Sequence, residues 1–241
     1  MSTSNRSMLR YLLIGFSIVS LGLAAFAYSG IGLFRSQDKI AYGSVVNIVD
    51  PAIDLPKLGT NKLQTLVLAG GCFWGVEGVF EKLKGVSAVV SGYVGGNAAT
   101  AHYEIVSTGL TGHAEGVQIT YDSEKISYGQ LLKVFFAIAH DPTQLNRQGP
   151  DSGPQYRSAI FFSNLDEQRV AQAYIEQLNQ SKVFAEPIVT QLAPLDRFYE
   201  AEGYHQNFIQ RNPRYPYVVV HDLPKLAQLT QQFPNLLKSD S

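Results

Sequence analysis

Apolar residues follow two different spacings along this chain, and the change from one to the other predicts where a strand gives way to a helix. Residues 66–69 form a short, uninterrupted apolar run, which predicts a buried strand. After them, Phe73, Val76 and Phe80 recur at helical spacing. Two glycines at residues 70–71 separate these patterns and predict a tight strand-to-helix turn.

The same patterns continue to the end of the chain and predict a mixture of strands and helices. Further strands are expected at residues 86–93, 114–121, 158–162, 188–192 and 217–221, and further helices at 127–140, 164–178 and from 222 onward. Ser127 with Gln130 predicts a capping box, and Asp222 with Pro224 predicts the N-cap and early proline of the last helix. Helices on one face of a mixed sheet, an α+β two-layer sandwich, fit this order best, and a doubly wound α/β fold is the alternative.

One segment between these elements, residues 143–157, has no apolar periodicity and contains two Gly-Pro pairs. We therefore expect a loop, which carries Asp151 and Tyr156 and leads into the strand at 158–162. A loop of this length inside a compact domain is more often functional than incidental.

The N-terminal region differs from the rest of the chain. Residues 11–34 contain no charged side chain and follow Arg6 and Arg10, and about 20 apolar residues suffice to cross a bilayer. We expect residues 1–34 to form a hydrophobic targeting helix that is either a membrane anchor or a signal peptide, because residues 25–27 also resemble a cleavage site. The basic residues before the apolar run favour a domain on the extracytoplasmic side, in the periplasm.

After residues 1–34, residues 35–61 are expected to be a linker, 62–226 the catalytic domain and 227–241 a C-terminal tail.

Composition narrows the possible functions and binding partners. With 19 Lys+Arg against 20 Asp+Glu, the chain has no electrostatic footprint for nucleic acid. Its single cysteine excludes an intramolecular disulfide and an all-cysteine metal site, and we expect no bound metal. Without a heptad or other association signal, a monomer is expected.

Three residues are candidates for chemistry on their positions alone. Cys72 is expected at a helix N-terminus, where the helix dipole lowers a thiol pKa below about 8.5, although a lone cysteine can also pack as a small buried hydrophobe. Alternation within 114–121 places Glu115 on the apolar side of its strand, so burial should raise its pKa and keep it a proton donor. The alternative for Glu115 is a solvated position at the sheet rim. Glu77 is expected to cap the helix or complement its dipole.

Several short strings together resemble the A-type peptide methionine sulfoxide reductases. They are Gly-Gly-Cys-Phe-Trp-Gly-Val-Glu at 70–77, Ser-Gly-Tyr-Val-Gly-Gly at 91–96, Thr-Gly-His-Ala-Glu at 111–115, His-Asp-Pro-Thr-Gln at 140–144, Gln-Tyr-Arg-Ser-Ala-Ile at 155–160 and Tyr-His-Gln at 204–206. The resemblance covers about residues 50–225 and implies a ferredoxin-like α+β fold.

The resemblance also implies a set of roles. Cys72 would be the nucleophile, Glu115 the acid, Tyr103 and Tyr156 the donors to the sulfoxide oxygen, Asp151 a supporting polar group, Phe73 and Trp74 the wall for the substrate methyl group, and His113 a substrate-binding residue. The implied reaction reduces S-methionine sulfoxide, protein-bound or free, and leaves a sulfenic acid at Cys72. Reductases of this kind repair oxidised methionine, and each of the two sulfoxide epimers has its own enzyme.

Two departures from the family pattern affect this picture. The chain has no second cysteine to resolve the sulfenic acid, so an external thiol is expected as reductant, either thioredoxin, glutaredoxin or a small thiol, with no bound cofactor. Pro154 stands where relatives usually carry threonine. Two other functions remain open: a thiol hydrolase with His113 or His205 as base, and a binding domain that has lost turnover.

Overall fold

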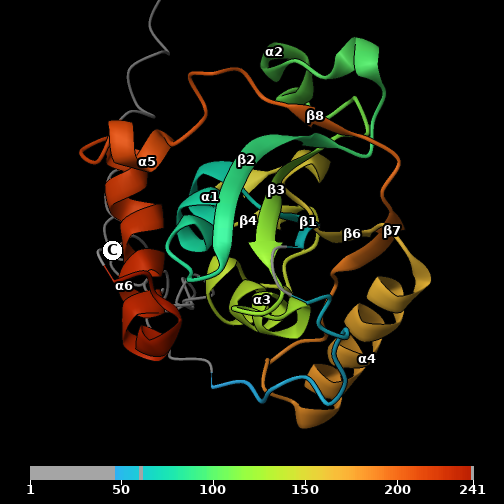
Figure 1. Cartoon of the computed structure of the whole chain (residues 1–241). Coiled ribbons are helices and arrows are strands. Elements are labelled where there is room, and N and C mark those ends of the chain that lie inside the picture. The colour runs from blue at the N-terminus through green and yellow to red at the C-terminus, as the bar shows by residue number, and fades with distance from the viewer. Residues whose placement is uncertain (1–46, 60–61, 240–241) are drawn as a thin grey trace, which may run out of the picture. The chain divides into compact units, whose positions relative to one another are not determined.

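The computed structural model describes residues 47–59 and 62–239, and a six-stranded mixed sheet is its central element (Figure 1). Its strands are β1 (Leu63–Gly70), β2 (Val86–Val94), β3 (Ala114–Asp122), β6 (Ser158–Phe162), β7 (Gln191–Pro194) and β8 (Phe198–Glu200). They lie in the order β7-β6-β1-β3-β2-β8, and each neighbouring pair is antiparallel except β6 and β7. This pairing excludes the doubly wound alternative, which requires a mostly parallel sheet.

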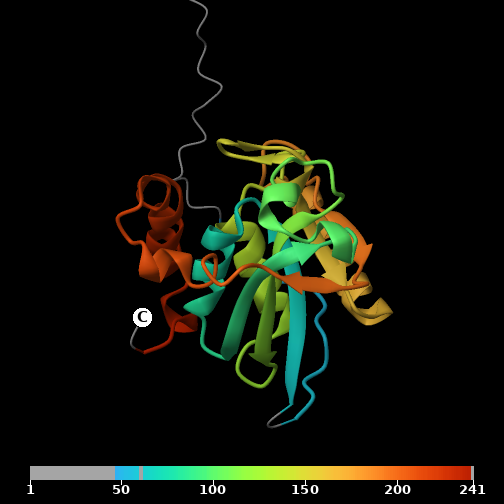
Figure 2. The same ribbon diagram turned by 90° about the horizontal axis from the view of Figure 1, so that it is seen from above.

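Helices pack beside this sheet. They are α1 (Phe73–Glu81), α2 (Tyr103–Val106), α3 (Tyr128–Val134), α4 (Leu165–Ser181), α5 (Phe208–Arg211) and α6 (Leu223–Gln232). A π-helical segment, η2 (Phe135–Ala139), continues α3, and a second, η4 (Val218–Asp222), leads into α6. In Figures 1 and 2, α5 and α6 lie toward one edge of the sheet and α4 toward the opposite edge.

The larger core lies where α1, α3 and α4 meet one face of the sheet. Alternate residues of β1, such as Leu66 and Leu68, join this core with α1 residues such as Phe80, whereas Val67 and Ala69 belong to a smaller cluster on the opposite face. This division follows from the two-residue period of a strand. By the same alternation, Glu115 in β3 shares a face with Val117 and Ile119, which belong to the larger core.

The turn between β1 and α1 depends on glycine. Gly71 has φ +90°, a region that residues with a side chain rarely adopt, and a Cβ there would lie 2.6 Å from side-chain carbons of Gln148. The chain can therefore reverse tightly after β1, and Cys72 becomes the N-cap of α1. The strand, turn and helix predicted around residues 66–80 are confirmed.

Most of the other predicted elements are confirmed, and the exceptions lie near the C-terminus. Ser127 and Gln130 form the expected capping box. The strand expected at 188–192 begins at Gln191, and that expected at 217–221 is wrong, because those residues form η4. Val218 is fully buried here, so packing against the helical layer overrides the strand preference of the valines. Asp222 precedes α6 but makes no capping hydrogen bond.

Part of the expected linker packs against the domain. Ile48 is buried, the Tyr174 hydroxyl donates to the Val49 carbonyl at 2.8 Å, and Lys133 pairs with Asp50 at 2.7 Å. The expected boundary at residue 226 falls within α6. Residues 1–34, predicted to be a targeting helix, lie outside the described residues, and none of the helices in the described ranges has the length and apolarity to cross a bilayer.

Candidate active site

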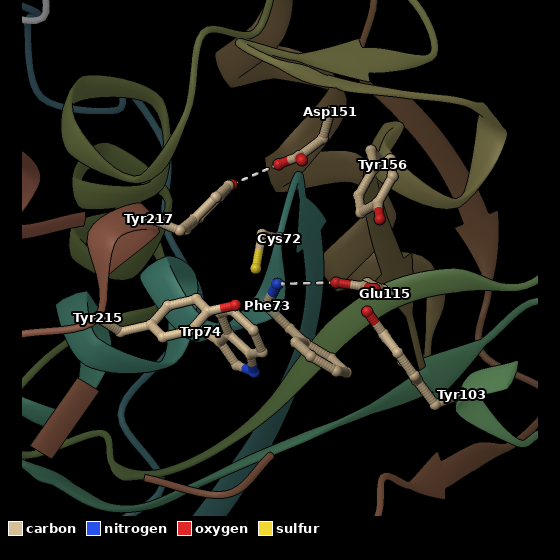
Figure 3. A pocket seen from close by; sticks show the side chains of 9 residues that line it. All are labelled: Cys72, Phe73, Trp74, Tyr103, Glu115, Asp151, Tyr156, Tyr215 and Tyr217. Atoms are coloured by element: carbon tan, nitrogen blue, oxygen red, sulfur yellow. Dashed lines mark hydrogen bonds between the residues drawn. The ribbon is translucent and has the colours of Figure 1, made fainter. Parts of the chain in front are cut away.

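A pocket of about 180 Å³ opens at the N-terminus of α1. Nine residues line it: Cys72, Phe73, Trp74, Tyr103, Glu115, Asp151, Tyr156, Tyr215 and Tyr217. Figure 3 shows the Cys72 sulfur facing the space between the Glu115 side and the Tyr217 side. Seven of the nine, all except Tyr215 and Tyr217, are candidate residues identified from the sequence. The nine come from five separate parts of the chain: 72–74, 103, 115, 151–156 and 215–217.

The Cys72 thiol is buried, and its environment is acidic. Burial raises its pKa well above the usual value, and the carboxylates of Glu115, Asp222 and Asp151 raise it further, whereas the Trp74 backbone N–H lowers it. The predicted lowering by the helix N-terminus is therefore wrong. One reason is that the Phe73 N–H, at the same helix end, donates to Glu115 at 3.2 Å instead of to the sulfur.

Glu115 lies on β3 beside the thiol, and 2% of its surface is exposed. Burial raises its pKa to about 8, against the opposing effect of the hydrogen bond from the Phe73 N–H. The predicted protonated carboxyl is confirmed, and the solvated alternative at the sheet rim is excluded. At neutral pH the group carries a proton that it can donate into the pocket.

Two phenols face this carboxyl. Tyr103 begins α2 and Tyr156 ends the short 3₁₀ turn Pro154–Tyr156, and in Figure 3 both hydroxyls point toward Glu115. Burial raises the pKa of each phenol, and the Glu115 carboxylate adds to the effect, so both remain proton donors. Pro154 occupies the first position of that turn, and the turn still brings Tyr156 to the pocket.

An aromatic wall lies below the thiol. The Trp74 ring stacks on Phe208 with centroids 3.6 Å apart and planes 5° apart, and its Nε1 donates to His205 Nδ1 at 3.1 Å. His205 is 2% exposed and also contacts Phe73 and Tyr103, with centroids 5.0 and 4.5 Å apart. These contacts fix the Trp74 plane, so the pocket has one rigid apolar side.

Two pocket residues, Tyr215 and Tyr217, were not singled out from the sequence. Tyr217 donates a short hydrogen bond to Asp151 Oδ2, and the rings of Tyr215 and Tyr217 each stand edge-on to Trp74 with centroids 6.0 Å apart. The signal available in the sequence is the pair of tyrosines flanking Pro216, of which Tyr217 was expected to begin the strand at 217–221. Long-range packing determines their position.

Two predicted placements fail. His113 does not line the pocket: it is 1% exposed, its Nε2 lies 2.9 Å from the Asn97 carbonyl oxygen, and its ring contacts Tyr93 and Tyr199. Glu77 does not cap α1, because it is buried within the helix and accepts the Asn207 N–H at 3.1 Å. Burial raises its pKa to about 7.

A buried ion pair lies behind the first turn of α1. Asp222 and Lys225 are almost fully buried, with Nζ 3.8 Å from Oδ1. A Cβ at Gly75 would lie 2.3 Å from Asp222 Oδ1 and 2.9 Å from Lys225 Nζ, so glycine leaves the space that these groups occupy. Burial raises the pKa of Asp222 to about 6, and its charge is one of those felt at Cys72.

The arrangement suits a thiol-dependent reductase that acts on an oxygen-bearing group. A sulfoxide sulfur becomes a good electrophile only when its oxygen is protonated or hydrogen-bonded, and here a protonated carboxyl and two phenols meet a thiol. A hydrolase needs a histidine within reach of the nucleophile. None of the nine pocket residues is a histidine, and the Nδ1 of His205 is engaged by Trp74.

Known proteins with similar sequences and folds agree with this class. The family model for peptide methionine sulfoxide reductase matches residues 64–237. Peptide methionine sulfoxide reductase MsrA 2 of Synechocystis sp. is 53% identical over 196 residues, covering 80% of this chain and 92% of the relative. MsrA 2 of Mesorhizobium japonicum is 58% identical over 173 residues, covering 72% and 89%.

Solved structures agree as well. Mxr1 from Saccharomyces cerevisiae in reduced form has a TM-score of 0.59 and 32% identity, covering 66% of this chain and 91% of that one. Methionine sulfoxide reductase A of Corynebacterium diphtheriae has a TM-score of 0.54 and 33% identity, covering 64% and 77%. The chain therefore belongs to the peptide methionine sulfoxide reductase family. It is an oxidoreductase that reduces methionine sulfoxide, so the binding-domain alternative is not supported.

Proposed function

We propose that Cys72 attacks the sulfur of S-methionine sulfoxide, protein-bound or free, while Glu115 protonates the oxygen. The observation that carries this proposal is that the thiol, a carboxyl with a pKa of about 8 and two phenols border one pocket. Tyr103 and Tyr156 donate to the oxygen as negative charge develops on it. Preorganised donors of this kind stabilise a transition state without reorganising during the reaction.

The thiol proton must be transferred, because burial and nearby carboxylates keep Cys72 protonated at rest. Glu115 gives its proton to the sulfoxide oxygen and then takes the thiol proton, so it relays one proton from sulfur to oxygen. The Cys72 electron pair forms an S–S bond to the substrate sulfur. The protonated oxygen then moves to the Cys72 sulfur as the substrate S–O bond and this transient S–S bond both break, and the electron pair of the S–S bond stays on the substrate sulfur. One thiol and one sulfoxide thus yield one sulfenic acid and one thioether.

The remaining pocket residues hold the substrate. Phe73 and Trp74 form the apolar surface for the methyl group, and the stacking of Trp74 on Phe208 supports this role because it keeps the ring in one plane. Asp151, which accepts a hydrogen bond from Tyr217, supplies a supporting polar group on the Tyr217 side of the pocket. We place no substrate contact on His113.

Recycling requires a second reaction. The chain contains one cysteine, so the sulfenic acid of Cys72 meets no partner thiol within this sequence. Two external thiol groups reduce it, giving the Cys72 thiol, a disulfide and water. Thioredoxin is our first choice of reductant, with glutaredoxin or a small thiol as alternatives.

A single-turnover experiment tests the proposal. The full chain is mixed with a peptide carrying S-methionine sulfoxide, without reductant and with a sulfenic-acid trap. We expect about one methionine per enzyme and the trap mass on Cys72, and a Cys72→Ser variant as control should give neither. Product without a trapped sulfur, or more than one turnover without reductant, would contradict the mechanism.

We also infer an exported, monomeric enzyme with a ferredoxin-like α+β sandwich. Strands β6-β1-β3-β2, with α1 and α3 as the connecting helices, support this fold class. The uncharged run at 11–34 supports either a membrane anchor or a cleaved signal. Cell fractionation with mass analysis of the mature N-terminus distinguishes the two, and a cytoplasmic protein with an intact N-terminus would contradict export.

A further inference from the structure

Four exposed apolar side chains lie in the segment that starts at the pocket residue Tyr215, and we call them the C-terminal ridge: Tyr215, Val219, Val220 and Leu223. They are 48%, 47%, 59% and 36% exposed, respectively. The Val219 N–H donates to the Tyr215 carbonyl at 3.0 Å, so these two residues lie one helical turn apart. The ridge therefore begins at a pocket residue and continues outward along η4.

The ridge is the outer side of a segment that is apolar on both sides. Val218 is fully buried on the inner side, whereas Val219 and Val220 face solvent. A short helix whose outer face is also apolar is typical of an interaction surface. Apolar side chains that remain exposed do not contribute to the folding stability of the domain itself. Between residues 213 and 223, Arg214 is the one Lys or Arg in this exposed segment, and Asp222 is buried.

The size of the pocket indicates which part of a substrate contacts this ridge. A volume of about 180 Å³ is below the roughly 300 Å³ at which ordinary small-molecule sites begin, so the pocket holds one side chain. In a peptide, the residues next to methionine sulfoxide must then lie outside the pocket, over its rim. Tyr215 belongs both to the pocket and to the ridge, which makes the ridge continuous with the surface that the substrate already contacts.

We propose that the C-terminal ridge is a subsite for the neighbour of methionine sulfoxide in a peptide substrate, and that it favours an apolar neighbour. This inference rests on the proposed function of the pocket. Covering Val219 and Val220 with an apolar side chain removes apolar surface of both partners from water, which is the source of the preference. We expect a preference of about fivefold over a polar neighbour of similar size.

The test compares matched substrates in single turnovers of the full chain without reductant. The substrates are N-acetyl methionine sulfoxide amide, and short peptides that differ only in leucine or asparagine on either side of the sulfoxide. The variant is Val219→Ser/Val220→Ser, which changes exposed positions only. Leu165→Ser on α4, a residue 77% exposed and absent from the pocket, is the matched control.

We expect wild type and Leu165→Ser to reduce the leucine peptide about fivefold faster at low substrate concentration, and the double variant to lose this preference. All three should reduce the small amide equally. An unchanged preference in the double variant, or none in wild type, would overturn the subsite. A defect of the double variant that is confined to turnover with a thioredoxin-type protein would also overturn it and assign the ridge to the reductant. Failure of wild type on the small amide would instead refute the proposed function of the pocket.

Discussion

The pocket has two walls, one that carries Cys72 and Glu115 and one that carries Asp151 and Tyr217, and they are built in different ways. On one wall, Cys72 and Glu115 come from α1 and β3, and the Phe73 N–H joins these elements through its hydrogen bond to Glu115. On the other, Asp151 comes from a two-residue strand and Tyr217 is the N-cap of η4. Regular elements therefore fix the reacting groups, whereas side-chain contacts over long sequence separations fix the wall that encloses them.

This comparison predicts the largest effect for Glu115→Gln. Removing a general acid typically costs a factor of 10² to 10⁴, so we expect the single-turnover rate to fall about 10³-fold. Wild-type activity should decline as pH rises through about 8, because Glu115 loses its proton there. The variant should lack this decline, since glutamine does not titrate. Stopped-flow measurement of methionine formation from pH 6 to 9.5 checks both expectations.

Alkylation of Cys72 supplies the control for that variant. The Glu115 carboxylate raises the Cys72 pKa, so its removal should lower that pKa and speed the reaction with iodoacetamide near pH 8. A variant that merely distorts the site would slow both reactions. If alkylation and sulfoxide reduction fall together, Glu115 is a structural residue and the proposed acid role is wrong.

A smaller loss of rate is expected when either phenol that faces Glu115 is removed. Tyr103→Phe and Tyr156→Phe each delete one donor facing Glu115 and leave the ring in place. Loss of one transition-state donor costs about 10²-fold in related oxyanion sites, and we expect that order here in the rate at saturating substrate. Substrate affinity should change less. If a variant weakens binding but leaves the saturated rate intact, that phenol binds the ground state only.

The opposite wall should respond more weakly. Tyr217→Phe removes the hydrogen bond to Asp151, and we expect a loss of about 1.5 kcal/mol in the free energy of unfolding, measured by urea denaturation. Asp151→Asn should have a similar effect. The double variant should then cost little more than either single variant, as a double-mutant cycle measures. Additive losses would show that the two residues act separately.

The sequence predicts the groups held by regular elements well, and the features that depend on long-range contacts poorly. The orientation of Glu115 was predicted correctly because the alternation of β3 puts it on the same face as the apolar residues of that strand. The position of Cys72 at the start of a helix was predicted correctly because two glycines end β1. The Cys72 pKa was predicted in the wrong direction because burial, which raises it most, and the proximity of Glu115 and Asp222, which raise it further, arise only through long-range packing. The strand expected at 217–221 failed for a related reason, since buried contacts of Val218 outweigh the local preference.

Glu77 gives a prediction that concerns stability and not catalysis, because it lies in α1 outside the pocket lining. It lies in α1 and accepts the Asn207 N–H, which ties the segment before Tyr215 to that helix. Its pKa is raised from 4.5 to about 7, so its proton favours the folded state. This contribution is complete below pH 4.5, falls as the pH rises to about 7 and is constant above it, a change of roughly 3 kcal/mol at most. Glu77→Gln keeps an acceptor for Asn207 without the titration, so urea unfolding at pH 5 and pH 8 should show a smaller difference in the variant than in wild type. An equal difference in both proteins would mean that Glu77 does not set the pH dependence of stability.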